Sequence, residues 1–408
     1  MARVLPFSCV RVSPERAQEV VSLPFDFYSD AEAFRFLLDN PRTYMHFDAA
    51  GVSFPEEIAS TGRVGYTYAK ALLEEFLGDG TYVEDDEPAY YVYRMTQPDG
   101  TSHTGIMGCV AVDDYFQGKV KKHEATRQEK EEGCKRLMKT FGAQTSPLFL
   151  TYPSDGSVEE LLDRAKQAQP LYSFTDAMQV LNEVWRVTDA DLVRKIEDHF
   201  AQVPELYISD GHHRATAAAA IGYEKQQETG EAGSFLSIIY PSEQVVIYDY
   251  NRALADLNGL TEQEFLELLK ADFQVEGPFG SAVKPQEKGV FGMYLGGKWY
   301  KLTFLRYGEA ETAVERLDVS VLQDRVLGPL LGIKDPRTDD RIDFVRGTRG
   351  IDELERRTIG GKPAAVCFAL YPTQLEEFFA VADAGLLMPP KSTWFEPKAR
   401  SGILMHRI

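Results

Sequence analysis

The chain has 408 residues, of which 44% are hydrophobic and 26% charged, and this composition is typical of a globular protein with two or three domains. Its 63 acidic and 44 basic residues give a formal net charge of −19, which disfavours nucleic acid as the main partner. The four cysteines form no CxxC pair and predict neither a disulfide framework nor a zinc site. Without a signal-peptide pattern or a bilayer-spanning apolar run, we expect a cytoplasmic protein with no membrane partner.

Short helices and strands are expected in the first hundred residues. Helices are favoured where apolar residues recur every three or four positions, and strands where apolar runs flank a turn. Asn40-Pro41 and Gly78 end the helices, and Gln97-Pro98-Asp99-Gly100 has the composition of a hairpin turn. The predicted elements are helices over 31–38 and 66–77 and a β-hairpin of strands 90–95 and 105–112.

The character of the sequence changes after Asp113, where a charge-rich stretch over 119–140 precedes a series of apolar runs. Four consecutive alanines predict a helix over 215–221 that ends at Gly222. The apolar runs 234–240 and 245–250 are predicted to form a pair of strands, with Pro241-Ser242 at the bend. The predicted elements are strands at 147–152, 206–209, 234–240 and 245–250 and helices at 158–168 and 215–221.

A last region begins near Gly277-Pro278 and again mixes both kinds of element. Its predicted elements are a hairpin of strands 290–295 and 299–304, a helix around 319–331, a strand at 364–370 and a helix at 374–384. The whole pattern predicts an α+β fold. We divide the chain into an N-terminal α/β region over 1–104, a core over 105–275 and a C-terminal α+β domain over 276–408.

The segment Asp210-Gly211-His212-His213-Arg214 lies between a predicted strand and the alanine-rich helix. A glycine turn that opens a helix presents unpaired N–H groups and a positive dipole end to an anion, and the histidines and Arg214 add donors. Asp210 could cap the helix, hold a histidine tautomer, or take part in binding Mg²⁺ or substrate. The alternative is a plain turn with surface histidines. A metal site is disfavoured, because adjacent histidines rarely point the same way.

This segment resembles the DGHHR box of the ParB/sulfiredoxin superfamily, in the form found in free serine kinases. More of the chain is similar to a long-chain SerK-like family of unknown function, through blocks in the expected order: Leu23-Pro24-Phe25-Asp26, Tyr90 to Arg94, Lys121 to Arg127 and Met388 to Thr393. The sequence departs from that family at Asn182-Glu183, where a histidine is more usual. The resemblance implies a ParB/sulfiredoxin-like core with N-terminal and C-terminal α+β extensions.

His123 and Glu124 form a second candidate group, expected at the start of a helix where the dipole favours an acidic residue. The resemblance implies that Glu124 is the catalytic base and that His123 assists it. From the residues alone, the favoured interpretation is that Glu124 and Arg127 form a surface pair on a solvated helix. Arg127 and Lys130 are candidate phosphate ligands or plain surface charges.

Near the C-terminus, Pro389-Pro390 leads rigidly into Lys391, Ser392 and Thr393, a set of side chains suited to an anion. The block lacks the glycine-rich lead of a Walker A loop. Its alternative role is a segment packed onto the preceding domain through Trp394 and Phe395. Asn251-Arg252, just after a strand, is a further candidate for substrate or phosphate contact.

By resemblance, we expect a kinase in which ATP or ADP binds the 210–214 turn with Mg²⁺ and Glu124 deprotonates a small hydroxyl substrate such as free L-serine. The alternative is a ParB-type module that binds or hydrolyses a nucleotide such as CTP as a switch. A sulfiredoxin-type reductase is disfavoured, because His212 stands where that box carries a cysteine. The sequence is compatible with an oligomer.

Overall fold

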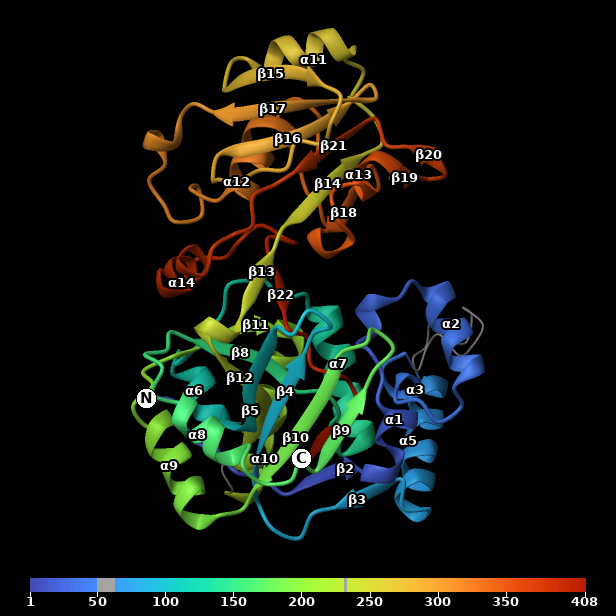
Figure 1. Ribbon diagram of the computed structural model, residues 1–408, viewed down its shortest axis with the longest axis vertical. Helices are drawn as coiled ribbons and strands as arrows, with labels where there is room; N and C mark the ends of the chain where they lie inside the picture. Colours follow the sequence, from blue (N-terminus) through green and yellow to red (C-terminus); the bar gives the residue numbers. More distant parts are fainter. Residues whose placement is uncertain (50–62, 231–232) are drawn as a thin grey trace. The chain divides into compact units, whose positions relative to one another are not determined.

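The predicted mixture of helices and strands is confirmed: the computed structural model, which describes residues 1–49, 63–230 and 233–408, has an α+β fold (Figure 1). The described residues form two units, and each is assembled from stretches far apart in the sequence. The first unit contains Met1–Lys121, Thr126–Val245 and Pro397–Ile408, and the second contains Lys122–Ala125 and Val246–Glu396. The division into regions 1–104, 105–275 and 276–408 stays a prediction.

The first unit is built on a nine-stranded mixed sheet with the order β6-β11-β8-β12-β5-β4-β10-β9, in which β1 also pairs with β5. The central strands are buried along nearly their whole length, as expected when both faces of a sheet are covered. Their bounds are β1 Val4–Leu5, β4 Tyr90–Thr96, β5 Ser102–Ala111, β6 Val120–Lys121, β8 Leu148–Tyr152, β9 Tyr172–Thr175, β10 Leu181–Val187, β11 Leu206–Asp210 and β12 Ser234–Pro241.

A second, antiparallel sheet of the first unit has the order β3-β2-β23-β7, so a strand from the end of the sequence lies between two early ones. Its strands are β2 Cys9–Val12, β3 Tyr82–Glu84, β7 Ala143–Gln144 and β23 Leu404–Arg407. The helices of this unit are α1 Ala17–Val20, α2 Asp30–Asp39, α3 Met45–Asp48, α5 Arg63–Gly78, α6 Val112–Phe116, α7 Gln128–Phe141, α8 Glu159–Ala165, α9 Ala190–Phe200 and α10 His212–Thr229.

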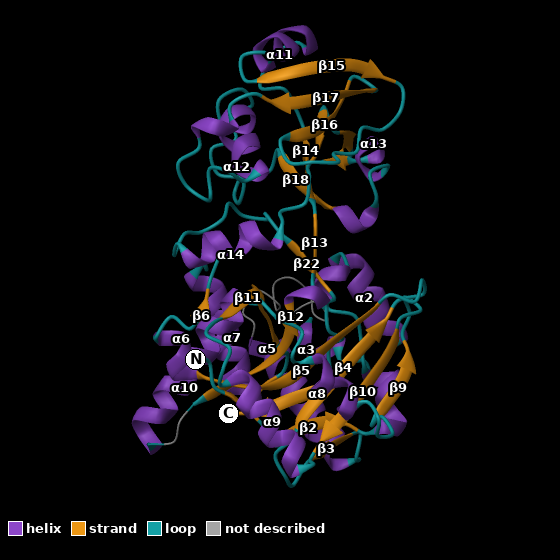
Figure 2. Cartoon of the chain, turned by 60° about the vertical axis from the view of Figure 1, so that its left-hand side comes forward, coloured by secondary structure: helices purple, strands orange, loops and turns teal. Residues whose placement is uncertain are grey.

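The second unit contains a six-stranded sheet with the order β15-β17-β16-β21-β14-β18 and two small two-stranded sheets, β13-β22 and β19-β20 (Figure 2). The strands are β13 Val246–Tyr248, β14 Tyr250–Leu254, β15 Phe273–Phe279, β16 Val290–Leu295, β17 Lys298–Phe304, β18 Ile342–Arg346, β19 Thr358–Ile359, β20 Lys362–Pro363, β21 Val366–Ala369 and β22 Trp394–Glu396. The helices are α11 Glu262–Leu269, α12 Asp318–Leu322, α13 Glu353–Arg356 and α14 Leu375–Asp383.

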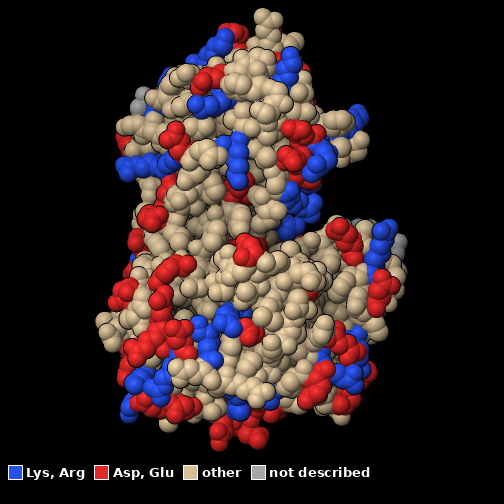
Figure 3. Space-filling model, viewed as in Figure 1, with Lys and Arg blue, Asp and Glu red and all other residues tan. Residues whose placement is uncertain are grey.

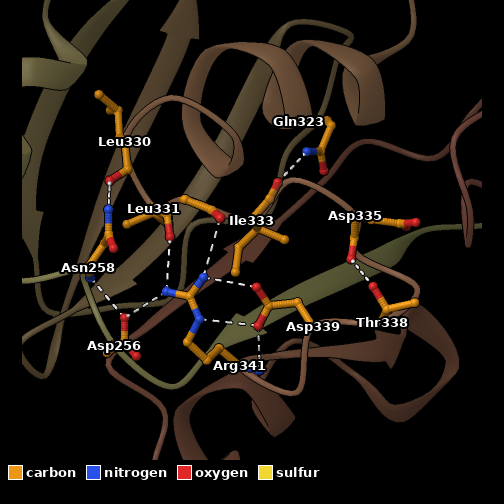
Figure 4. A network of polar contacts seen from close by, with 11 residues as sticks. Asp256, Asn258, Gln323, Leu330, Leu331, Ile333, Asp335, Thr338, Asp339 and Arg341 are labelled. Atoms are coloured by element: carbon orange, nitrogen blue, oxygen red, sulfur yellow. Dashed lines mark hydrogen bonds and ion pairs between the residues drawn. The ribbon is translucent and has the colours of Figure 1, made fainter.

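A network around Arg341 holds the loops of the second unit together (Figure 4). Its guanidinium binds both carboxylate oxygens of Asp339, at 3.1 and 2.9 Å. It also donates to the carbonyl oxygens of Leu331 and Gly332, at 3.2 and 3.3 Å. A bidentate guanidinium with carbonyl acceptors fixes loop geometry, because its donors are held in one rigid plane.

The two predicted hairpins, 90–95 with 105–112 and 290–295 with 299–304, are confirmed as β4-β5 and β16-β17. The prediction that 234–240 pairs with 245–250 is wrong. Strand β12 pairs with β5 and β8, whereas β13 pairs with β22, because Pro241 and a short helical turn over Ser242–Gln244 separate the two strands.

Two helix predictions are corrected. Helix α10 does not end at Gly222, because this glycine packs inside the unit, where a Cβ would lie 2.5 Å from Val112 Cγ2, and the left-handed cap is Gly230 at φ +76°. The helix predicted around 319–331 is shorter than expected, because only α12 is α-helical. A single π-helical turn over Gln323–Leu327 follows it, in which the Gly328 N–H donates to the Gln323 carbonyl.

Candidate functional site

The turn over Asp210–Arg214 is formed as the sequence predicts. Strand β11 lies buried between β6 and β8. The chain continues from its end to Gly211, whose backbone is in the left-handed region at φ +95°, and α10 begins at His212. A Cβ at Gly211 would lie 3.0 Å from Arg214 Nη2 and 3.1 Å from Leu148 Cδ2. Both the backbone angle and the space therefore require glycine here.

The N-terminus of α10 carries no side-chain cap, since Gly211 occupies the N-cap position. The N-cap residue itself therefore supplies no side-chain acceptor. The 18-residue helix directs its first N–H groups and the positive end of its dipole toward the turn. Such a helix N-terminus favours an anion with several oxygen acceptors.

Lys398 joins three segments that are far apart in the sequence. Its ammonium nitrogen lies 2.8 Å from Asp210 Oδ2 and 3.3 Å from Asp26 Oδ2, and its side chain is only 8% exposed. Although burial raises the pKa of Asp210, Lys398 and then Arg214 lower it well below its ordinary range. The half-exposed Asp210 is thus ionised and able to accept further hydrogen bonds or a cation.

Arg214 lies against the turn itself. Its guanidinium donates to the Pro147 carbonyl at 3.1 Å and lies 3.9 Å from Asp210. The Arg214 charge also acts on Asp48. Burial raises the pKa of the Asp48 carboxyl, and a hydrogen bond with Ser401 and the Arg214 charge oppose this shift. Ser146 donates to Asp48 at 3.4 Å. The turn therefore has a fixed guanidinium beside its glycine.

The two histidines of the turn have different surroundings. His212 is buried, at 3% exposure, which rules out the alternative that both histidines are surface residues. His213 Nε2 accepts a hydrogen bond from the backbone N–H of Arg127 at 3.0 Å, so its other ring nitrogen carries the proton in the neutral form. This bond ties the turn to the segment that precedes α7.

His123 and Glu124 do not start a helix, contrary to the prediction. Helix α7 begins at Gln128, because the backbone up to Arg127 is extended, with φ −107° and ψ 129° at Arg127. His123 is buried in the second unit, with its ring 4.8 Å from that of Phe378. Its Nε2 lies 3.4 Å from Thr393 Oγ1. Glu124 is partly buried in the same short stretch.

The Lys391-Ser392-Thr393 block is held tightly within the second unit. The Ser392 hydroxyl donates to the Pro389 carbonyl at 2.6 Å, and the Lys391 carbonyl accepts from Arg252 Nη2 at 3.0 Å. Asn251 Oδ1 accepts the Leu370 N–H at 2.9 Å. The side chains of Ser392 and Asn251 thus form hydrogen bonds with backbone groups of the same unit, whereas the Lys391 ammonium is exposed.

The predicted site residues fall into two sets. Asp210–Arg214 and Arg127 belong to the first unit, and the second unit contains His123, Glu124, Asn251, Arg252 and the Lys391–Thr393 block. Lys398 is a site residue that the sequence analysis missed, and nothing in its local pattern indicates that it meets Asp210. Among the described residues, no three His, Cys, Asp or Glu side chains are grouped as a metal site.

Two further surface properties bear on partners. On the face drawn in Figure 3, basic side chains interrupt the acidic ones on both units, although acidic residues predominate in the chain. In the part of the chain that the structure describes, no helix has the length and apolar character needed to cross a bilayer.

In a comparison with protein families, the family described as "Protein of unknown function (DUF1015)" matches residues 4–320. No curated protein matches the sequence.

Similar solved structures include SbnI with a C-terminal truncation from Staphylococcus aureus, with 14% identity, a TM-score of 0.37 and coverage of 73% of this chain and 85% of that one. A free serine kinase variant in complex with AMP has 15% identity, a TM-score of 0.37 and coverage of 72% and 87%. A conserved hypothetical protein from Pyrococcus furiosus has 16% identity, a TM-score of 0.33 and coverage of 72% and 90%.

Proposed function

We propose that this chain, which belongs to the DUF1015 family, is a nucleotide-dependent kinase that phosphorylates the hydroxyl group of a small molecule, free L-serine above all. The observation that carries the proposal is the Gly211 turn, where an uncapped helix N-terminus, the Arg214 guanidinium and the nearly buried Lys398 ammonium surround one ionised carboxylate. Phosphoryl transfer needs this kind of fixed positive field, because its transition state spreads negative charge over the phosphoryl oxygens.

The turn supplies three kinds of group to this reaction. The N–H groups at the start of α10 and Arg214 bind the terminal phosphates of ATP or ADP. Asp210 is suited to Mg²⁺, which proteins hold through one or two carboxylates together with substrate phosphates, and the low pKa of Asp210 keeps it ionised for that purpose. The bound ion would neutralise phosphate charge.

We assign the general base to Glu124, with His123 beside it in sequence. The acceptor hydroxyl forms the new bond to the terminal phosphorus, the bond from that phosphorus to the leaving nucleotide breaks, and the hydroxyl proton passes to the Glu124 carboxylate. Arg127, whose N–H binds His213, is proposed to contact phosphate.

The second candidate function is a nucleotide-binding or nucleotide-hydrolysing module of ParB type that has no small-molecule acceptor. The same Gly211 turn favours it, because the turn by itself requires only a phosphate. The two candidates therefore differ in whether the phosphoryl group reaches a hydroxyl other than water.

One assay separates them. The full-length protein is incubated with Mg²⁺, L-serine and ATP, ADP or CTP, and O-phospho-L-serine and the nucleotide product are measured by mass spectrometry. The variants are Glu124→Gln, His213→Ala and Arg214→Gln. Glu129→Gln and Arg194→Gln, which change exposed residues of the first unit, serve as matched controls.

Serine phosphorylation that falls at least a hundredfold in Glu124→Gln, roughly the contribution of a general base, and persists in Glu129→Gln supports the kinase. Nucleotide binding without any phosphorylated product supports the regulatory module. If no nucleotide binds or raises the melting temperature of the wild type, both candidates are wrong.

A further inference from the structure

One face of the six-stranded sheet in the second unit carries two cations, each directly opposite an aromatic residue. Strands β14 and β18 are antiparallel, and their register pairs Tyr250 with Arg346 and Arg252 with Phe344. Because alternate residues of a strand share a face, these four side chains lie on the same side of the sheet. Two positive charges are therefore neighbours there.

A third cation comes from the segment that follows Pro390. The Lys391 ammonium lies 5.6 Å from the centre of the Tyr250 ring, and the Lys391 carbonyl accepts from Arg252. The same segment places the Trp394 ring against the Arg346 guanidinium, at 4.6 Å from its centre. The guanidinium of Arg252 likewise lies 4.6 Å from the centre of the Phe344 ring. We call Arg252, Arg346 and Lys391 the cation cluster.

Arg252 is the unusual member of the cluster. It is only 3% exposed, and its guanidinium donates to two backbone carbonyls, those of Tyr250 and Lys391. Within residues 1–49, 63–230 and 233–408, no carboxylate lies at ion-pair distance from Arg252 or Lys391. Burial without a counter-ion lowers the pKa of Arg252 to about 9. Buried charges are normally paired, and contacts with rings offset only part of their desolvation.

The surroundings of the cluster are preorganised and open on one side. Lys391 adopts the left-handed backbone region at φ +57°, which a residue with a side chain rarely occupies, and the bond from Arg252 holds it there. The side chain of Lys391 is exposed and that of Arg346 partly so, which leaves access from solvent. The aromatic rings hold the Arg252 and Lys391 cations in place without neutralising their charge.

We propose that the cation cluster of Arg252, Arg346 and Lys391 is a binding site for a phosphate-bearing small molecule in the second unit. A phosphate monoester or diphosphate suits it better than a carboxylate, because three positive charges favour a ligand with two or more negative charges. The proposal does not rest on phosphoryl transfer at the Gly211 turn. The site would hold in a protein that proves not to be a kinase.

The test is isothermal titration calorimetry of the full-length protein with inorganic phosphate, pyrophosphate and acetate at constant ionic strength. It is carried out in the Arg214→Gln background, so that the turn of the first unit does not add to the signal. The variants of the cluster are Lys391→Gln, Arg346→Gln and Arg252→Lys. Lys362→Gln, an exposed lysine of the same unit, is the matched control.

We expect pyrophosphate to bind at least tenfold more tightly than acetate, and each cluster variant to weaken pyrophosphate binding tenfold or more while Lys362→Gln leaves it unchanged. The exposed Lys391 keeps the test decisive even where a change at the buried Arg252 impairs folding. Equal affinity in Lys391→Gln, Arg346→Gln and Lys362→Gln, or no pyrophosphate binding at all, would overturn the proposal. The role of Arg252 would then be structural, as a hydrogen-bond donor to the Lys391 carbonyl.

Discussion

Lys398 and Asp210 form an ion pair of 2.8 Å across 188 positions of the sequence. Because Lys398 also lies 3.3 Å from Asp26, one ammonium group balances two carboxylates next to the Gly211 turn. This relationship makes Lys398 a part of the proposed phosphate site that the DGHHR pattern alone does not contain.

Replacing Lys398 by glutamine should weaken nucleotide binding. Loss of a charge-assisted contact of this kind corresponds to about 1.5–3 kcal/mol, or roughly tenfold or more in affinity. The measurement is calorimetric titration with ATP or ADP in the presence of Mg²⁺. Lys195→Gln, an exposed lysine of the same unit, is the control, and equal affinity of the two variants would remove Lys398 from the site.

Gly211→Ala should separate the binding role of the turn from backbone strain. Gly211 and Gly230 stand at the two ends of α10 and both have positive φ, but only at Gly211 would a Cβ press on Arg214 and Leu148. An L-residue in this region costs roughly 1–2 kcal/mol, so Gly230→Ala should lose about this much stability in urea unfolding, and Gly211→Ala should lose more because of the added close contacts. Only Gly211→Ala should lose nucleotide affinity, and an equal loss in Gly230→Ala would contradict the proposed role.

Asp318 should make the stability of the second unit depend on pH. It is 7% exposed, and burial raises its pKa to about 7, while the Gly289 N–H and Lys288 oppose the shift. The folded state therefore holds a proton that the unfolded state has released between pH 3.8 and about 7, so stability falls as pH rises through this window. The maximal slope for one proton is about 1.4 kcal/mol per pH unit.

Urea unfolding at a series of pH values measures this effect. Asp318→Asn should flatten the decrease, because asparagine keeps an acceptor and has no proton to release. The exposed Asp340→Asn should leave the decrease as it is in the wild type. A wild-type stability that rises over this window, with no difference between the variants, would exclude the role of Asp318.

The Asp176–Arg400 pair should be among the interactions on which the first unit most depends. Both side chains are nearly buried, at 10% and 5% exposure, and Asp176 also accepts from Asn182 at 3.0 Å. Asp176→Ala leaves a buried guanidinium without its partner, which costs about 3–5 kcal/mol. Asp163→Ala, which breaks an ion pair with a 73% exposed carboxylate, should cost less than about 1 kcal/mol. Similar midpoints of urea unfolding in the two variants would argue against this assignment.

The elements that were predictable from sequence are those whose signals are local. Gly211 between an apolar run and four alanines specified a strand, a turn and a helix, and all three are present. The predicted end of α10 was wrong, because Gly222 is required by close packing against Val112 of α6 and does not end the helix. The same limit applies to His123, whose burial against Phe378 cannot be read from its charged neighbours.

The candidate site shows the limit more clearly. The DGHHR segment was recognisable because its residues are consecutive, whereas Lys398 and Asp26 meet Asp210 only through the tertiary fold. The cation cluster likewise depends on the register of β14 against β18, which fixes the partner of each cation and carries no sequence signature. Long-range pairing thus decides which polar residues act together.

The position of β23 has a consequence for biosynthesis. This strand lies between β2 and β7, and the residues that contain it also supply Lys398. A nascent chain that has been translated as far as residue 396 still presents β2 and β7 with unpaired edges, and exposed strand edges favour aggregation. The four-stranded sheet of the first unit can therefore be completed only after the second unit has been synthesised. Folding of the first unit on the ribosome is delayed, and the second unit is free to fold earlier.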